Sequence, residues 1–276
     1  RGDVNEPHRL LRIVRRGAGD AGRADADVRA HERTHAARHM QRNGTAHRAV
    51  RIQIVLRHAE DAMFHLVCVG APAAAQDGLA RFCDVFCEKG VFSAEESRVI
   101  LTCARRCGLI PKIHADEIEP VGGSVLAGEL GAISAEHLIV CPPAGIEAMA
   151  KGGVIACLLP ATSFNLGAVF APARDMVNAG VPVAMATDFN PGSCPCLNMQ
   201  FVINLGCLKY KLTPEEVLTA VTLNGAAAID LADKVGSVEE GKLGDLVIWD
   251  APDLDYICYR VGSNLAKTVI KRGEIV

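Results

Sequence analysis

The sequence predicts an α/β protein built on a parallel sheet, and three observations lead to this fold class. From about residue 79, short apolar segments alternate with helical segments five times, the repeating pattern of parallel strands joined by helices. Three of the predicted strands end in polar residues, as expected at the active-site end of a (β/α)8 barrel. No G-x-G-x-x-G follows the first strand, which argues against a dinucleotide-binding open sheet. We therefore predict an incomplete barrel with about five βα units.

The five predicted units follow one another in order along the chain. The first helix has clear boundaries, because Ser93 is a good N-cap, Glu96 completes a capping box three residues later, and Gly108 ends the helix. The predicted strands are RFCDVFC, LIPKIHA, AISAEHLIV, GVIACLLP and VPVAMATD, and the helices that follow them are SAEESRVILTCARRCG, GGSVLAGELG, PPAGIEAMAKGG, APARDMVNAG and CPCLNMQFVINLGCLKYK.

The C-terminal part of the chain carries a different pattern. LTPEEVLTAVTLNGAAAIDL predicts a pair of helices, with Thr213 as the cap and Pro214 in the first turn. GSVEEGKLGDLVIWDAP and AKTVIKRGEIV then predict short strands separated by glycines. We predict a partial barrel over residues 79–235 and a small β appendage over residues 236–276.

The first part of the chain differs in composition from the rest. Residues 1–81 contain fourteen arginines, nine acidic residues, seven of the nine histidines and no lysine, whereas the remainder contains nine lysines. A basic arm for nucleic acid is one interpretation, but the interspersed acids and the near absence of aromatic residues argue against it. We predict that residues 1–78 are an atypical segment, either disordered or read out of frame from a GC-rich gene.

Bulk properties exclude several classes of protein. No apolar run reaches the ~18–20 residues needed to cross a bilayer, and the chain does not open with an apolar signal segment. Several of the eleven cysteines lie inside apolar runs, where a reduced thiol behaves as a small hydrophobic group. We therefore expect a cytoplasmic protein with reduced cysteines and with neither a membrane nor a nucleic acid as its partner.

Three strand ends carry residues that suit a metal site. His114 lies in IHADE, His137 in AEHL and Asp188 in ATDFNPG. Imidazole and carboxylate ligands from different barrel strands suit one divalent ion, Zn²⁺ or Fe²⁺, which generates hydroxide for hydrolysis. Each residue also has a structural alternative: His114 can close a strand, His137 can belong to a loop, and Asp188 can cap a helix.

Together these motifs resemble the amidohydrolase superfamily and, within it, the imidazolonepropionase family. The resemblance rests on FCDVFCEKGVFSAEES, KIHADE, SAEHL, ATDFNPG, LTPEEVLTAVTLNGAAAI and GSVEEGKLGDLVIWD, and it covers residues 79–276. It implies an α/β metal-dependent amidohydrolase barrel of the (β/α)8 TIM-like type, here incomplete, followed by part of a C-terminal β-sandwich domain. It also implies a hydrolase of cyclic amides in histidine degradation, a homodimer and one Zn or Fe ion.

The resemblance assigns roles to individual residues. It implies that His114 and Asp188 bind the metal, and that Glu117, His137 and Asp188 take part in catalysis. Glu117 corresponds to the acid that contacts the substrate ring and takes part in proton transfer, and His137 to the histidine that faces the scissile carbonyl.

The resemblance also implies a substrate and a binding loop. Asn190, Gly192 and Ser193, together with Glu117, fall where the family binds its substrate. The implied reaction is hydrolysis of 4-imidazolone-5-propanoate to N-formimidoyl-L-glutamate.

One family motif is absent from this chain. The family carries an H-x-H pair on its first strand, and no H-x-H occurs in the 276 residues. We therefore expect weak metal binding and slow turnover by the chain as written. Two alternatives stay open, namely another cyclic-amide hydrolase or deaminase of the superfamily and a non-catalytic fragment.

The frame-shift hypothesis makes a prediction about the gene. We expect that the coding DNA upstream of codon 79, translated in its other frames, encodes an H-x-H pair followed by strand-like sequence. Sequencing this region and translating all six frames is the measurement. Alternative frames without apolar periodicity would contradict the hypothesis.

Overall fold

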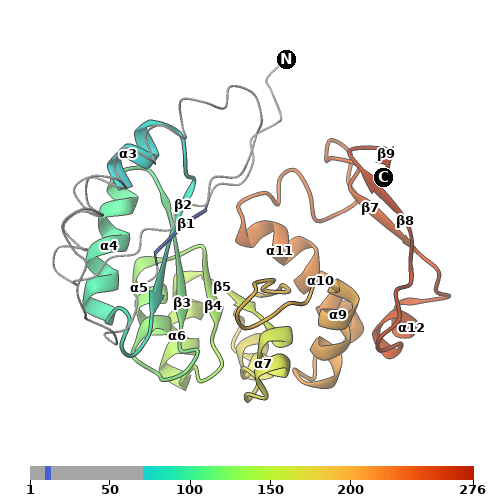
Figure 1. Ribbon diagram of the computed structural model, residues 1–276, viewed down its shortest axis with the longest axis horizontal. Helices are drawn as coiled ribbons and strands as arrows, with labels where there is room; N and C mark the ends of the chain where they lie inside the picture. The colour runs from blue at the N-terminus through green and yellow to red at the C-terminus, as the bar shows by residue number, and fades with distance from the viewer. Residues whose placement is uncertain (1–9, 14–70) are drawn as a thin grey trace, which may run out of the picture.

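The computed structural model describes residues 10–13 and 71–276, which form two sheets with their surrounding helices (Figure 1). Strands β1 to β6 make a parallel sheet in sequential order, and β7 to β9 make a separate antiparallel sheet. The strands are β1 (Leu10–Ile13), β2 (Phe82–Cys87), β3 (Ile110–Ala115), β4 (Ser134–His137), β5 (Ile155–Leu158), β6 (Val183–Met185), β7 (Leu246–Trp249), β8 (Ala266–Lys271) and β9 (Glu274–Ile275). The helices are α3 (Ala71–Gln76), α4 (Ala94–Arg106), α5 (Gly123–Leu130), α6 (Pro143–Gly152), α7 (Pro160–Leu166), α8 (Ala173–Asn178), α9 (Met199–Leu208), α10 (Pro214–Val221), α11 (Leu223–Ala228) and α12 (Leu254–Tyr259).

The five strands predicted from the sequence are all present, as β2 to β6, and each is followed by at least one helix. The structure adds β1, which pairs in parallel with β2 from Leu10↔Phe82 to Ile13↔Val85. The prediction of an incomplete barrel with about five βα units is confirmed by β2 to β6 and the helices that follow them. Strand β1 was not predicted, because its four residues are too few to show a strand period within an arginine-rich segment.

The register of the parallel sheet separates apolar from polar side chains. Val85, Ile113 and Ala135 are register partners on one face, where α4 and α5 pack, and all three are fully buried. Neighbouring residues along each strand point to the opposite face. That face carries a row of buried polar side chains, namely Asp84, Lys112, His114, Ser134 and Glu136. A buried polar face is what a barrel interior with a functional site requires.

Helices α5 and α6 lie unusually close together because glycines line their contact. A Cβ added at Gly128 would lie 2.3 Å from the backbone carbon of Ala148, and one added at Gly152 would lie 2.4 Å from the carbonyl oxygen of Gly128. The two helices follow β3 and β4, the hydrogen-bonded strands that carry His114 and His137, so the close helix contact lies directly outside this part of the sheet.

The predicted helix boundaries are confirmed at two capping boxes. The Ser93 hydroxyl accepts from the amide of Glu96, whose carboxylate accepts in turn from the Ser93 amide. Thr213 and Glu216 make the same reciprocal pair at the start of α10. After α4 ends at Arg106, Gly108 adopts a φ of 89°, a left-handed conformation that suits a glycine.

The C-terminal strands form the predicted β appendage, which lies beyond α9 to α11 when seen from the parallel sheet (Figure 1). A short helix that the sequence did not indicate, α12, joins β7 to β8. The side-chain amides of Gln200 and Asn204 on α9 donate to backbone carbonyls of α12, at 3.1 Å and 2.7 Å from Asn204 to Ile257 and Cys258. These bonds hold α12 against α9.

Two further expectations concern the described residues. Within residues 71–276, the cysteines are all free, in agreement with the prediction of reduced thiols. The same part of the chain contains no helix with the length and apolar character of a membrane span.

The α5–α6 contact predicts an asymmetry between two glycines. We expect Gly128→Ala to lower the free energy of unfolding by about 1–3 kcal/mol, because the new methyl group overlaps the backbone of α6. Urea denaturation followed by circular dichroism measures this change.

The matched control is Gly225→Ala in α11. There the nearest atom to an added Cβ is the carbonyl oxygen of Ala220 at 3.5 Å, an ordinary contact. We expect a gain of up to about 1 kcal/mol from the helix preference of alanine. Equal effects of the two substitutions would contradict the close approach of α5 and α6.

Candidate metal and catalytic site

The ends of β3, β4 and β6 share an uncommon backbone conformation. Asp116 follows β3 with a φ of 49°, His137 and Leu138 end β4 at 70° and 57°, and Asp188 follows β6 at 54°. Left-handed backbone costs a non-glycine residue about 1–2 kcal/mol and persists where the surrounding structure holds it, often at functional sites. The strained positions fall at or within two residues of His114, His137 and Asp188, the residues predicted to form the site.

His114 is the most firmly held of the predicted residues. Its side chain is buried, and Nδ1 lies 2.9 Å and 2.8 Å from the two carboxylate oxygens of Asp84. The ring of Phe86 meets it edge to face, with the ring centroids 6.3 Å apart. These contacts fix the orientation of the imidazole.

His137 lies beside His114, and Glu117 lies beside His137. The two imidazole rings have centroids 5.3 Å apart and are tilted by 53°. His137 Nε2 lies 3.5 Å from Oε2 of Glu117, whose side chain is 16% exposed while that of His137 is 3% exposed. The structure therefore brings together two histidines and one partly exposed acid at the ends of neighbouring strands.

Asp188 is held by a different set of contacts. The Thr162 hydroxyl on α7 donates to Oδ2 of Asp188 at 2.7 Å. Among residues 71–276, one group of three side chains places potential ligand atoms within 4.8 Å of one another, and it consists of Asp84, His114 and Glu136. Asp188 is not a member of this group, so its pairing with His114 on one metal stays a prediction.

The loop after Asp188 is organised around one asparagine. Oδ1 of Asn190 accepts from the backbone amides of Gly192 and Ser193 at 2.9 Å and 2.7 Å. Its Nδ2 donates to the Ser193 hydroxyl and to the backbone carbonyl of Asp188 at 2.9 Å and 2.8 Å. Asn190, Gly192 and Ser193, three of the four residues predicted to bind substrate, therefore lie in one compact turn next to Asp188.

The buried polar face contains residues that the sequence interpretation missed. Lys112 Nζ lies 2.8 Å from Oε1 of Glu136, and both side chains are over nine-tenths buried. Burial lowers the pKa of Lys112, but the charge of Glu136, assisted by Asp84, outweighs this effect and raises the pKa above its ordinary value. The sequence did contain a signal for these residues. Asp84 in FCDVFC and Lys112 in IPKIHA are charged residues inside predicted buried strands, where a charge is uncommon and needs a partner.

The donor set of this region fits a divalent cation. Asp84, His114 and Glu136 offer carboxylate oxygens and an imidazole nitrogen, the ligand types that zinc and iron take. Oε2 of Glu136 is buried and has no hydrogen-bond partner among the described residues. A candidate site for a divalent metal therefore exists on the buried polar face of β2 to β4.

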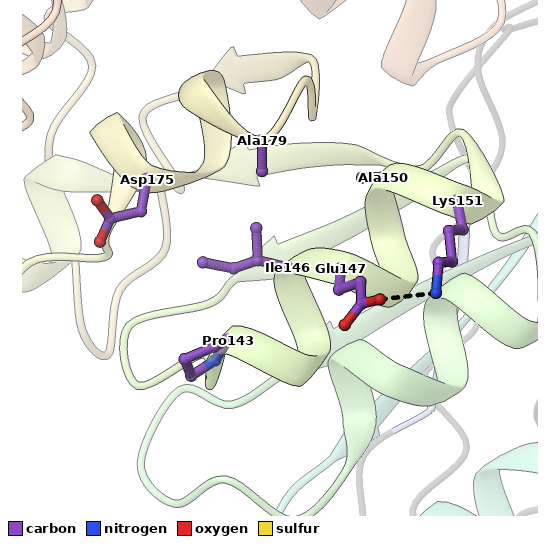
Figure 2. A pocket seen from close by; sticks show the side chains of 7 residues that line it. All are labelled: Pro143, Ile146, Glu147, Ala150, Lys151, Asp175 and Ala179. Carbon is purple, nitrogen blue, oxygen red and sulfur yellow. Dashed lines mark hydrogen bonds and ion pairs between the residues drawn. The ribbon is translucent and has the colours of Figure 1, made fainter.

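A separate groove lies on the helical surface. It has a volume of about 520 Å³, runs between α6 and α8, and is lined by residues that include Pro143, Ile146 and Ala179 (Figure 2). Glu147 and Lys151 form an ion pair at its edge. None of the predicted site residues lines this groove, so it is not the candidate site.

Comparison with known proteins places these residues in context. The model of the amidohydrolase family matches residues 90–276. Imidazolonepropionase of Alkaliphilus metalliredigens is 55% identical over 206 residues, or 74% of this chain and 49% of that protein. The imidazolonepropionase of Bacteroides fragilis is 54% identical over 204 residues, with the same shares. The chain spans about half the length of the curated relatives it matches.

Solved structures show the same fold at low sequence identity. An adenosine deaminase from Xanthomonas campestris with bound zinc has a TM-score of 0.63 and 19% identity, over 96% of this chain and 59% of that one. Atrazine chlorohydrolase from Arthrobacter aurescens complexed with zinc has a TM-score of 0.61 and 18% identity, over 86% and 58%. These likenesses confirm the predicted fold class.

The loop geometry makes Asn190 the residue that holds the turn. We expect Asn190→Ala to speed hydrogen exchange at the amides of Gly192 and Ser193, since both lose their acceptor. The free energy of unfolding should fall by about 0.5–1.5 kcal/mol for each net hydrogen bond lost. Exchange measured by NMR and urea denaturation test the two effects.

Asn165→Ala serves as the control. This side chain donates to the carbonyl oxygen of Ser193 and leaves both amides bonded to Asn190. Faster exchange in the control than in Asn190→Ala would show that the turn is held from α7 instead.

Proposed function

The chain belongs to the amidohydrolase family, and we propose that it carries the C-terminal half of an imidazolonepropionase active site. The observation that carries the proposal is the group formed by His114, His137 and Glu117 at two neighbouring strand ends. Relatives 50–55% identical to this region, which are imidazolonepropionases, support the choice of substrate. The proposed reaction is hydrolysis of the ring amide of 4-imidazolone-5-propanoate.

We propose that one zinc or iron ion is held by His114 and Asp188. Such an ion, when bound, lowers the pKa of a water molecule toward neutrality and so supplies a nucleophile. Nδ1 of His114 lies 2.9 Å from Oδ1 of Asp84. If Nδ1 carries the proton of a neutral imidazole, Nε2 would offer its lone pair to the metal. The Thr162 hydroxyl donates to the carboxylate of Asp188 and so orients it. In the proposed mechanism this carboxylate would accept a proton from the nucleophile.

His137 and Glu117 would act on the substrate directly. The imidazole of His137 lies beside that of His114. In the proposed mechanism it would donate a hydrogen bond to the carbonyl oxygen under attack. Glu117 is the more exposed of the pair and lies 3.5 Å from His137 Nε2. A carboxylate in this position can carry a proton to the ring nitrogen as the amide bond breaks.

The turn around Asn190 would support substrate binding. The backbone amides of Gly192 and Ser193 already donate to Oδ1 of Asn190. The loop therefore keeps its shape without a ligand and loses little conformational entropy when a ligand binds. We propose that this turn of Asn190, Gly192 and Ser193 binds the substrate and the formimidoyl-glutamate product through the Ser193 hydroxyl, while Asn190 maintains the shape of the turn.

The region matched by the relatives is half of their length, and this limits the expected activity. An H-x-H pair, which the family resemblance requires as two more metal ligands, does not occur in this chain. We therefore expect slow turnover and weak metal binding. A homodimer and a cytoplasmic location are proposals that rest on the same resemblance.

Metal analysis tests the proposed ligands. We expect the full chain, loaded with Zn²⁺ or Fe²⁺, to bind one ion, and we expect Asp188→Ala and His114→Ala each to weaken binding at least about tenfold. Elemental analysis after equilibrium dialysis measures the stoichiometry and affinity. Thr219→Ala, an exposed change in α10, is the control. Unchanged affinity in both ligand variants would contradict the proposed site.

A chimera tests the reaction. Fusing the N-terminal half of the Alkaliphilus metalliredigens relative to residues 79–276 should restore hydrolysis of 4-imidazolone-5-propanoate, and His137→Ala in the chimera should abolish it. Hydantoin, guanine and adenosine serve as comparison substrates. Turnover of one of these in preference to imidazolonepropanoate would overturn the substrate assignment.

A further inference from the structure

We propose that Asp84 is a positioning residue, whose buried carboxylate holds the Nδ1–H of His114 and directs Nε2 toward the metal. The inference rests on the proposed metal-binding role of His114. It adds a residue of β2 to a site that was assembled from the ends of β3, β4 and β6, and Asp84 itself was not among the predicted residues.

The sheet register explains how Asp84 reaches its partner. Asp84 pairs with Lys112 in the register between β2 and β3, so His114 lies one diagonal step nearer the C-terminal end of the sheet. Both carboxylate oxygens of Asp84 lie within 2.9 Å of the same ring nitrogen. Asp84 is fully buried, so water does not compete for the bond.

A metal bound to His114 would bring a positive charge close to the buried carboxylate of Asp84. Two carboxylates, those of Asp84 and Glu136, share the buried face with one ammonium group, that of Lys112. Lys112 pairs with Glu136, which leaves one negative charge to be compensated. A divalent ion on Nε2 of His114 supplies positive charge next to it, and a carboxylate on the far nitrogen makes the imidazole a stronger ligand.

A competing assignment makes Asp84 a metal ligand in its own right. Asp84, His114 and Glu136 do offer ligand atoms within 4.8 Å of one another. The contact geometry favours positioning instead, because Oδ1 of Asp84 makes the hydrogen bond to Nδ1 and Oδ2 lies 2.8 Å from the same nitrogen. A metal held by Nε2 would be on the other side of the ring. The two assignments differ in whether a substitution of Asp84 changes zinc affinity in a chain that already lacks His114.

A double-mutant cycle on the full chain separates them. We expect Asp84→Asn to weaken zinc binding by about 10- to 100-fold, the usual effect of removing such a partner. In a His114→Ala background the same change should have less than about a twofold effect, since the two residues act through one bond. Isothermal titration with ZnCl2 measures the four affinities.

Two controls exclude a general loss of structure. Asp116→Asn also converts a fully buried carboxylate of this region into an amide, and we expect zinc affinity to change less than about threefold. Asp84→Glu retains the carboxylate and should recover part of the affinity lost in Asp84→Asn. Circular dichroism and thermal unfolding of every variant confirm that the sheet is intact.

A second readout needs no metal. In the metal-free chain, ¹⁵N NMR of the imidazole should show the Nδ1–H tautomer for His114, assigned by its loss in His114→Ala. Asp84→Asn should shift the population toward Nε2–H, because an amide can also donate to Nδ1.

The outcomes are distinct for the two proposals. A wild-type chain that binds no zinc overturns both the proposed metal site and the positioning role. Zinc binding that His114→Ala weakens and Asp84→Asn leaves unchanged overturns the positioning role alone. An effect of Asp84→Asn that is equally large without His114 shows direct ligation and also overturns it.

Discussion

Charged side chains lie buried on one face of the parallel sheet, and the strand register that holds them is the constraint on which the site depends. Removing an ion from water costs several kcal/mol unless a partner compensates it. Lys112 and Glu136 compensate each other, and Asp84 faces His114. Shifting any of β2, β3 or β4 by one residue would turn these groups toward the helices and separate the pairs. Register and site chemistry are therefore fixed by the same contacts.

Helices pack on the apolar face of the sheet, opposite the buried charges, and support this register. The apolar face of β2 to β4 packs against α4 and α5, and α5 in turn packs closely on α6 through glycines. Close backbone packing leaves little freedom for β3 and β4 to move apart. The strained residues at the strand ends, such as His137 with its φ of 70°, are held by this rigid support.

Much of the fold could be predicted from the sequence, because strong local signals coincide with the observed elements. The capping boxes at Ser93 and Thr213 give the starts of α4 and α10, and alternating apolar strands and helices give β2 to β6. The elements that were missed are short. The four-residue β1 and the six-residue α12 depend on contacts with distant segments, which local periodicity does not reveal.

The candidate site was predictable in part for a similar reason. His114, His137 and Asp188 stand at strand ends, where polar residues suggest function, and the structure brings His114, His137 and Glu117 together. Asp84 and Lys112 lie within strands, and their partners are set by the cross-strand register rather than by nearby sequence. The predicted domain boundaries at residues 78 and 235 stay predictions.

The attachment of α12 to α9 has a consequence for the way this protein responds to its solvent. Gln200 and Asn204 on α9 make this attachment with neutral side-chain amides, and Gln200 also accepts from the backbone amide of Leu265. Screening by salt weakens interactions between exposed charges and leaves neutral, buried hydrogen bonds nearly unchanged. The hydrogen bonds that join α9 to α12 should thus change little with ionic strength, whereas exposed ion pairs such as Lys89 with Glu119 lose their contribution as salt rises.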